Sequence, residues 1–260
     1  MTKKEEGYIL IFVFITLTSL GILLPVLLQL VSNEVIITKH YQQQIKNYYL
    51  VKGVMVVAKE EVSKQINKLS YISKENLDQL QIEGSIVLKD PNSSHQIKTE
   101  YLVKEIVDES SKLNLNLASQ ERLEELPEIG ETISQRIVDH RLYNYLEELL
   151  NLSGIDNKLY EQIKDYLTLK TQGKINLNTA PIEVLNTLPG VGETLATRII
   201  MNRIFTNIEE LKDVEGVGPA TYQQLEPLVK VDSNYFQILV RIKIPERELQ
   251  TERLKIIKLD

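Results

Sequence analysis

The residues with catalytic or metal-binding chemistry are scattered along this chain. Its 260 residues include three histidines and no cysteine, which excludes a disulfide, a thiol nucleophile and a cysteine metal site. His40, His95 and His140 lack the spacing of metal ligands. No Gly-x-Ser-x-Gly, HExxH or Gly-x-x-x-x-Gly-Lys motif is present. Acidic pairs such as Glu124-Glu125 alternate with leucines at helical spacing, which indicates solvated helix faces. We therefore expect no enzymatic activity.

Glycine-rich turns offer a second kind of chemistry, the binding of phosphates. Gly190-Val191-Gly192 and Gly216-Val217-Gly218 each precede an apolar helical pattern, and free amides at a helix start can bind an anion. However, residues 109–232 contain 12 Lys and Arg against 20 Asp and Glu, a net charge of −8. A nucleic-acid duplex would be repelled by that charge. We therefore expect hairpins that make a compact helical domain, and nucleic-acid binding is the alternative.

The turns belong to an internal repeat. The stretch from Lys174 to Arg203 matches the stretch from Lys112 to Arg141 after a shift of 62 residues, without a gap. The match continues beyond this stretch and pairs Gly154 with Gly216. Matching residues inside it include Asn114 and Asn176, Asn116 and Asn178, Ala118 and Ala180, Leu123 and Leu185, Gly130 and Gly192, Arg136 and Arg198, and Arg141 and Arg203. The sequence therefore predicts two copies of one helical unit side by side.

Each copy is predicted to form a helix, a hairpin turn and a second helix. Asn-x-Asn and a small residue predict a capped helix start, with Pro181 just inside it. This helix must end near Leu188-Pro189, and Gly190 and Gly192 then allow a tight turn with positive φ. Leu195, Ile199 and Ile200 at helical spacing predict the second helix. A third, shorter version is expected from Val214 to Leu225.

The pattern resembles the helix-hairpin-helix family over roughly half of the chain. The resemblance implies hairpins at Gly130, Gly190, Gly192, Gly216 and Gly218 that could grip phosphates, helped by Lys or Arg. This chain departs from the pattern, because Glu128 replaces the first glycine of copy one and Glu131 and Glu193 follow the hairpins. Four arginines, Arg136, Arg198, Arg141 and Arg203, are expected to lie over the hairpins and pair with carboxylates.

The N-terminus carries a membrane signal. The 24 residues from Tyr8 to Val31 contain no charge, and such a helix, about 36 Å long, would span a bilayer. Lys3 and Lys4 favour a cytoplasmic N-terminus, with the chain after Val31 outside the cytoplasm. A cleaved signal peptide is the alternative, but its apolar region is shorter and ends in small residues.

This N-terminus resembles the class III signal of type IV prepilins and pseudopilins. The resemblance implies that a prepilin peptidase cuts between Gly7 and Tyr8 and that Tyr8 is then methylated. Pro25 lies where pilin helices are commonly kinked. Tyr8 replaces the usual Phe or Met, and Phe12 replaces the nearly universal Glu at the fifth mature position. Loss of that Glu is a feature of the family of general secretion pathway protein K, the tip pseudopilin.

The remaining segments complete a pilin-like pattern of class α+β. Residues 34–69 predict an amphipathic helix with one apolar face, formed by Val35, Ile45, Tyr49, Met55, Ala58, Val62, Ile66 and Leu69. A membrane anchor followed by an unrelated helix is the alternative. Strands are expected at 85–89, 96–107, 237–244 and 253–259, with a turn at Asp90–Ser94. An antiparallel sheet is therefore interrupted by the repeats, as the protein K family implies.

The expected organisation is a leader at 1–7, a transmembrane helix at 8–31, and a pilin-like helix with first strands at 32–108. Inserted tandem repeats follow at 109–230, and strands at 231–260 complete the sheet. The resemblance implies a minor pseudopilin at the tip of a type II secretion pseudopilus. It would be a single-pass protein of the inner membrane whose partners are other minor pseudopilins, the inner-membrane secretion machinery and prepilin peptidase. Calcium is known in the helical domain of some relatives, but no loop here has the spacing to name ligands.

Two other functions remain open from the sequence. One is a membrane-anchored helix-hairpin-helix DNA-binding protein of the competence receptor type, which the charge of the repeats and the C-terminal strands disfavour. The other is the equivalent minor pilin of a type IV pilus.

Overall fold

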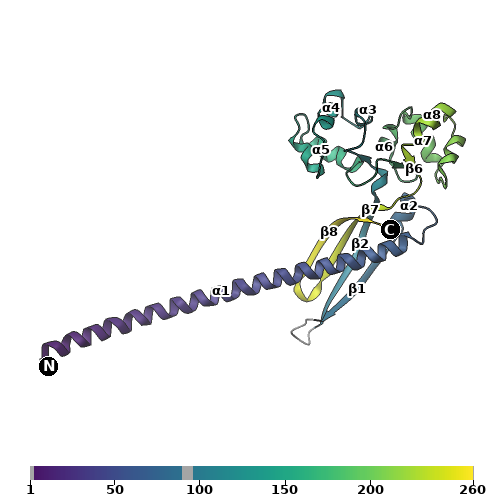
Figure 1. Ribbon diagram of the computed structural model, residues 1–260. Helices are drawn as coiled ribbons and strands as arrows, with labels where there is room; N and C mark the ends of the chain where they lie inside the picture. The colour runs from purple at the N-terminus through teal and green to yellow at the C-terminus, as the bar shows by residue number, and fades with distance from the viewer. Residues whose placement is uncertain (1–2, 90–95, 260) are drawn as a thin grey trace. The chain divides into compact units, whose positions relative to one another are not determined.

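The computed structural model describes residues 3–89 and 96–259, with only the backbone described at residues 3–10, 88 and 89. The turn expected at Asp90–Ser94 therefore lies outside the described residues. The chain divides into two compact units, residues 1–53 and 54–260. The first unit is the N-terminal part of one helix, α1 (Lys3–Ile66), which Pro25 does not end (Figure 1). The uncharged residues 11–31 of α1 leave their large apolar side chains exposed.

A four-stranded antiparallel sheet organises the second unit. It consists of β1 (Ile82–Lys89), β2 (Gln96–Asp108), β7 (Tyr235–Ile244) and β8 (Leu249–Lys258), in the order β1-β2-β7-β8. Along β7 alternate side chains are buried, because successive side chains point to opposite faces of a sheet. We call residues 54–89, 96–108 and 233–259 the sheet body.

The last turns of α1 contribute to the core of the sheet body. Val54, Ala58 and Val62 are fully buried, and Glu61 lies within electrostatic reach of Tyr101 on β2. Met55 and Ile66 are also buried, as the amphipathic pattern predicted. Val35, Ile45 and Tyr49 on the earlier part of the predicted face are exposed, while Leu69 is half-buried beyond the end of α1. The short helix α2 (Lys74–Asp78) connects α1 to the sheet.

The sheet is split in the sequence. Its central strands β2 and β7 pair through Asp108↔Phe236 and Ile106↔Ile238, although residues 109–234 separate them. The fold is therefore the expected α+β arrangement with a helical insertion. β1 and β8 begin earlier than the predicted Ser85 and Arg253. For β8 the reason is that polar residues such as Gln250 and Glu252 lie on the open face of the strand.

The insertion contains two repeats, each closed by a two-stranded parallel ribbon. Repeat 1 runs from β3 (Leu113–Asn114) to β4 (Leu167–Thr168), and repeat 2 runs from β5 (Ile175–Asn176) to β6 (Val229–Lys230). These short strands were not predicted, because two residues are too few to show an alternating pattern. They pair the first and last residues of each repeat, so each repeat closes on itself.

Each repeat contains two hairpins, so the insertion holds four. Repeat 1 has α3 (Gln120–Glu124), α4 (Glu131–Asp139), the 3-10 helix η2 (Leu146–Asn151) and α5 (Asn157–Ile163). Repeat 2 has α6 (Ile182–Asn186), α7 (Glu193–Met201), η4 (Ile208–Asp213) and α8 (Pro219–Leu225). The hairpin before α5 was not predicted, because Ile155-Asp156 replaces the Val-Gly of its counterpart. Buried residues of both repeats, such as Leu123 and Leu185, belong to one core.

The hairpin glycines differ in what they contribute to the backbone. Gly190 and Gly216 have φ of 73° and 102°, a conformation that favours glycine. Gly130, Gly192 and Gly218 are instead the N-caps of α4, α7 and α8, with negative φ. The expectation that Gly192 supplies positive φ is therefore wrong. In repeat 1 the equivalent of Gly190 is Glu128, which adopts φ of 61°.

These angles predict that substitution lowers the free energy of unfolding at Gly190 but not at Gly192. Gly190→Ala is expected to lower the free energy of unfolding by about 1–2 kcal/mol, because a Cβ disfavours positive φ. A Cβ on Gly190 would meet no atom closer than 3.9 Å, so the loss arises from the backbone alone. Gly192→Ser is the control, because Gly192 has open space around it and serine is a good N-cap.

Urea denaturation of the full chain in detergent, followed by circular dichroism, measures both variants. We also expect Glu128→Gly to be neutral or stabilising. Equal loss of stability from Gly190→Ala and Gly192→Ser would contradict this account.

Candidate functional site

The sheet body meets the repeats at a buried carboxylate, Asp108, the last residue of β2. Its Oδ1 accepts the Ser110 backbone N–H at 2.7 Å and the Ser233 hydroxyl. Its Oδ2 accepts the Asn176 amide at 2.8 Å and the Thr179 hydroxyl at 2.7 Å. Asn176 and Thr179 belong to repeat 2, and Ser233 precedes β7. One side chain therefore joins β2, repeat 2 and the start of the returning strand.

Burial raises the pKa of Asp108, and the hydrogen bonds from Ser233, Thr179, Asn176 and the Ser110 amide oppose this rise by favouring the charged form. Such a group is costly to bury and is retained only where its partners are fixed. Here the partners come from both ends of the insertion. The geometry therefore suits a positioning role rather than proton transfer.

A second buried polar group lies next to Asp108. Glu109 in the 3-10 helix η1 (Glu109–Ser111) forms an ion pair with Lys112 at 2.7 Å and accepts the hydroxyl of Thr168 at the end of repeat 1. Both charged side chains are almost fully buried. Adjacent residues thus fix the two repeats separately, Asp108 through repeat 2 and Glu109 through repeat 1.

The Asn-x-Asn motifs hold loops together instead of capping helices. Asn116 donates to the Tyr143 carbonyl and accepts the Tyr143 amide, and Asn178 does the same with Phe205. In α3 the cap is Ser119, and Pro181 occupies the N-cap position of α6 without a side-chain bond. The predicted capping role of the asparagines is therefore wrong. Two loops that are far apart in the sequence meet here. The side-chain amides supply partners for backbone N–H and C=O groups that would otherwise have none.

The four repeated arginines bind backbone carbonyls, which corrects the expected pairing with carboxylates. Arg141 donates to the Leu115 carbonyl at 3.0 Å and to the Ala118 carbonyl, and Arg203 makes the equivalent bonds to Leu177 and Ala180. Arg136 and Arg198 donate to the carbonyls of Ser153 and Glu215. Arg198 also lies 3.6 Å from the Glu215 carboxylate, so for this residue an ion pair is present. These arginines hold the hairpins closed.

Arg122 connects the two repeats. It occupies the position of Val184 in repeat 2, and its Nε donates to the Thr187 carbonyl at the end of α6. Burial lowers the pKa of Arg122 to about 10. A charged side chain at an otherwise apolar core position is explained by this contact across the repeats.

The hairpins are poorly suited to phosphates. Glu131 and Glu193 lie in the first turns of α4 and α7, directly after the caps Gly130 and Gly192. At the hairpin of Gly216 and Gly218, Arg198 is paired with Glu215 and the Lys212 ammonium lies over the Tyr222 ring at 4.3 Å. Acidic residues at these turns repel a polyanion, and the nearby cationic side chains already have partners within the protein. Both features disfavour binding of a polyanion.

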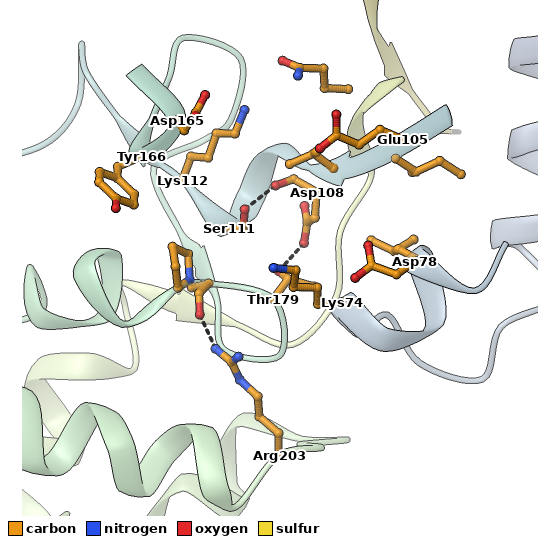
Figure 2. Close-up of a pocket in the computed structure, with 16 residues that line it drawn as sticks. Lys74, Asp78, Glu105, Asp108, Ser111, Lys112, Asp165, Tyr166, Thr179 and Arg203 are labelled. Carbon is orange, nitrogen blue, oxygen red and sulfur yellow. Dashed lines mark hydrogen bonds between the residues drawn. The ribbon is translucent and has the colours of Figure 1, made fainter. Parts of the chain in front are cut away.

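A cavity of about 550 Å³ lies between α2, β2 and the two repeats (Figure 2). Its charged lining residues are of both signs, namely Lys74, Lys112, Arg203, Asp78, Glu105, Asp108 and Asp165. Figure 2 shows Thr179 directed at Asp108, with Arg203 bonded to a backbone carbonyl. Among the described residues, no group of three or more His, Cys, Asp or Glu could hold a metal ion. Ligands for the calcium considered from the sequence therefore stay unassigned.

The N-terminal site residues lie on α1. The structure describes only the backbone at Gly7 and Tyr8, both within α1, so cleavage there stays a prediction. Phe12, at the position of the missing Glu, is 69% exposed. In the part of the chain that the structure describes, α1 is the one helix long and apolar enough to cross a membrane, with mean hydropathy 2.6 in its apolar window.

The burial of the charged residues at the junction was not predicted from the sequence. Asp108, Glu109 and Lys112 are charged residues placed directly after an apolar strand and before an apolar repeat. Such residues are expected at the surface. Their burial depends on contacts with Thr168, Asn176 and Ser233, which no local pattern indicates.

Replacing the junction carboxylate predicts a large loss of stability. Asp108→Asn is expected to lower the free energy of unfolding by about 2–4 kcal/mol, because an amide nitrogen replaces an acceptor that faces two donors. Asp156→Asn is the matched control. Asp156 caps α5 by accepting the Leu159 amide, and asparagine caps equally well.

The same pair of variants tests the pKa of Asp108. Because this pKa is raised on folding, the native state holds a proton that the unfolded state has lost above about pH 4. The contribution of Asp108 to stability is therefore complete below that pH and falls as the pH rises through the raised pKa. Denaturation between pH 3.5 and 8 should show this slope in wild type and not in Asp108→Asn. Identical slopes would contradict the assignment.

Comparison with known proteins gives matches to the helical repeats and to longer stretches of the chain. A family model described as helix-hairpin-helix motif matches residues 108–168 and 170–230. "Endonuclease/exonuclease/phosphatase family domain-containing protein 1" of Xenopus laevis is 25% identical over 178 residues, which cover 55% of this chain and 32% of that protein. Its Danio rerio counterpart is 25% identical over 183 residues, with 60% and 31% covered. The chain thus spans about a third of the length of these curated relatives.

A solved structure matches most of the chain. A chain in the crystal structure of the GspK-GspI-GspJ complex from the type 2 secretion system of enterotoxigenic Escherichia coli superposes with a TM-score of 0.60. The alignment has 17% sequence identity and covers 86% of this chain and 94% of that one. The fold of this protein is therefore the one found in that chain of the type 2 secretion complex, a long N-terminal helix and an antiparallel sheet with an inserted helical region.

Proposed function

We propose that this chain is a minor pseudopilin at the tip of a type II secretion or type IV pilus-like pseudopilus, with a structural role in protein export. The observation that carries the proposal is the combination of an apolar helix, residues 11–31, with a sheet split by two helical repeats. The same arrangement occurs in the pseudopilin complex over 86% of this chain. The partners would be other minor pseudopilins, as they are in that complex.

Phe12 supports a place at the tip. In pilin-like filaments the resemblance implies a Glu at this mature position, and a charge within the bilayer is costly unless a neighbouring subunit matches it. A subunit with no other subunit above it needs no such charge. The exposed apolar side chain of Phe12 can instead face lipid or neighbouring helices.

The protein would act without catalysis. The buried charged groups at the junction, Asp108, Glu109 and Lys112, are bonded to one another or to backbone and side-chain donors. The competence-receptor alternative requires a surface that attracts DNA, whereas residues 109–232 carry a net charge of −8. A gel-shift assay of the full chain in detergent at low salt should therefore show no micromolar complex.

Processing at Gly7 provides the direct test. Protein extracted from the membrane of cells that contain prepilin peptidase is expected to begin at a methylated Tyr8, as measured by intact mass and N-terminal sequencing. Gly7→Val should leave the leader attached, because the resemblance places the cut directly after this glycine. Gly21→Val is the control, since Gly21 lies on the same helix with open space around it. A mature N-terminus at any other residue would overturn the proposal.

A further inference from the structure

The two repeats have the same local structure but different surroundings. In repeat 2, Thr179 is bonded to Asp108 of the sheet body. Arg203 lines the cavity shared with α2, where burial lowers its pKa to about 10 although the charge of Glu75 acts in the opposite direction. Ile204, the next residue, is half-buried. This side of repeat 2 is therefore seated on the sheet body.

The equivalent side of repeat 1 is open. Leu117, the counterpart of Thr179, is 59% exposed, and Leu142, the counterpart of Ile204, is 79% exposed. Leu117 lies beside Gly173 in the linker between the repeats, and this contact leaves most of the side chain uncovered. Leu117 thus occupies the position that repeat 2 uses against Asp108, and Leu142 follows Arg141, the counterpart of the Arg203 that lines the cavity.

The open side of repeat 1 is preorganised. Arg141 binds the carbonyls of Leu115 and Ala118, and Asn116 binds the backbone of Tyr143 in both directions. These bonds hold the loops of Leu117 and Leu142 next to each other, as their equivalents hold the seated loops of repeat 2. We call Leu117, Arg141 and Leu142 the open face.

Two exposed positions that follow Leu142 in the sequence are also more apolar than their counterparts in repeat 2. Tyr145 is 70% exposed where repeat 2 has Asn207, and Leu150 is partly exposed where repeat 2 has Lys212. Polar side chains, such as Asn207 and Lys212 of repeat 2, are suited to contact with water. Large apolar side chains exposed at these positions instead favour a protein contact.

We propose that the open face binds the sheet end of a neighbouring pilin-like subunit, in the way that repeat 2 binds the sheet end of its own chain. The template defines the chemistry of this partner. At the seated face, an apolar residue of α2, Leu77, and two carboxylates, Asp108 and Glu75, line or approach the contact. The partner would therefore offer an apolar side chain to Leu117 and Leu142 and a carboxylate to the Arg141 guanidinium. This inference rests on the proposed function.

Photo-crosslinking in cells tests the contact in the full chain. A photoreactive amino acid at Leu142 is expected to give an adduct with another subunit that has a pilin-like N-terminal helix, mapped to the end of its sheet. The same amino acid at Met201 is the control, because Met201 is equally exposed at 78% and its counterpart in repeat 1 is the polar Asp139. Equal adducts at both positions would overturn the proposal. Adducts with lipid, nucleic acid, a second copy of this chain or an unrelated protein would also overturn it.

Substitution separates this contact from folding. Leu142→Glu should lower the yield of that adduct, now measured from a photoreactive group at Leu117, at least tenfold, and Met201→Glu should leave it unchanged. Both residues are exposed, so the urea midpoint should stay within the range of surface substitutions. An unchanged adduct in Leu142→Glu would overturn the proposal.

A third position distinguishes the failure of this inference from the failure of the proposed function. Ile37 lies on α1 and is 63% exposed, and the proposed function places α1 against the helices of other subunits. Adducts with pilin-like subunits from Ile37 but not from Leu142 would overturn the open face alone. Absence of such adducts from both positions would overturn the proposed function as well.

Discussion

The second unit of this protein depends on a carboxylate buried between elements that are far apart in the sequence. Asp108 ends one central strand, receives donors from repeat 2 through Asn176 and Thr179, and receives another from Ser233 just before the second central strand. A buried acceptor with four donors tolerates little displacement, since each lost bond leaves a polar group without a partner. The insertion is thus fixed at its entry and at its exit by one group. Glu109 and Thr168 provide the same restraint for repeat 1.

Much of the architecture was predictable because it follows from periodic patterns. The uncharged N-terminal run, alternation along β7 and the shift of 62 residues each depend on spacing within a segment. The amphipathic pattern correctly indicated Ala58, Val62 and Ile66, whose burial repeats along a helix. Such signals arise from one element facing one core.

What could not be predicted depends on contacts between segments. The arginines at 141 and 203 were expected to find carboxylates, but loop carbonyls lie closer and need donors. The asparagines were expected to cap helices, yet they join loops 27 residues apart, as Asn116 does with Tyr143. Gly192 was expected to provide positive φ, and the chain places that conformation two residues earlier, at Gly190. In each case the residue type indicated that the position is structurally important, but it did not indicate the bonding partner or the backbone angle. These are set by the tertiary structure.

The split between β2 and β7 also restricts the order in which the protein can mature. Strand β2 is synthesised with β1, but its other neighbour is β7, which follows residues 109–234. Until β7 arrives, β2 exposes one unpaired edge, and such edges are prone to pairing with other chains. Because each repeat joins its own first and last residues through β3–β4 or β5–β6, folding of the insertion shortens the loop to be closed. Folding of the insertion is therefore expected to lower the entropic cost of pairing β7 with β2, because it brings the two ends of the insertion closer together.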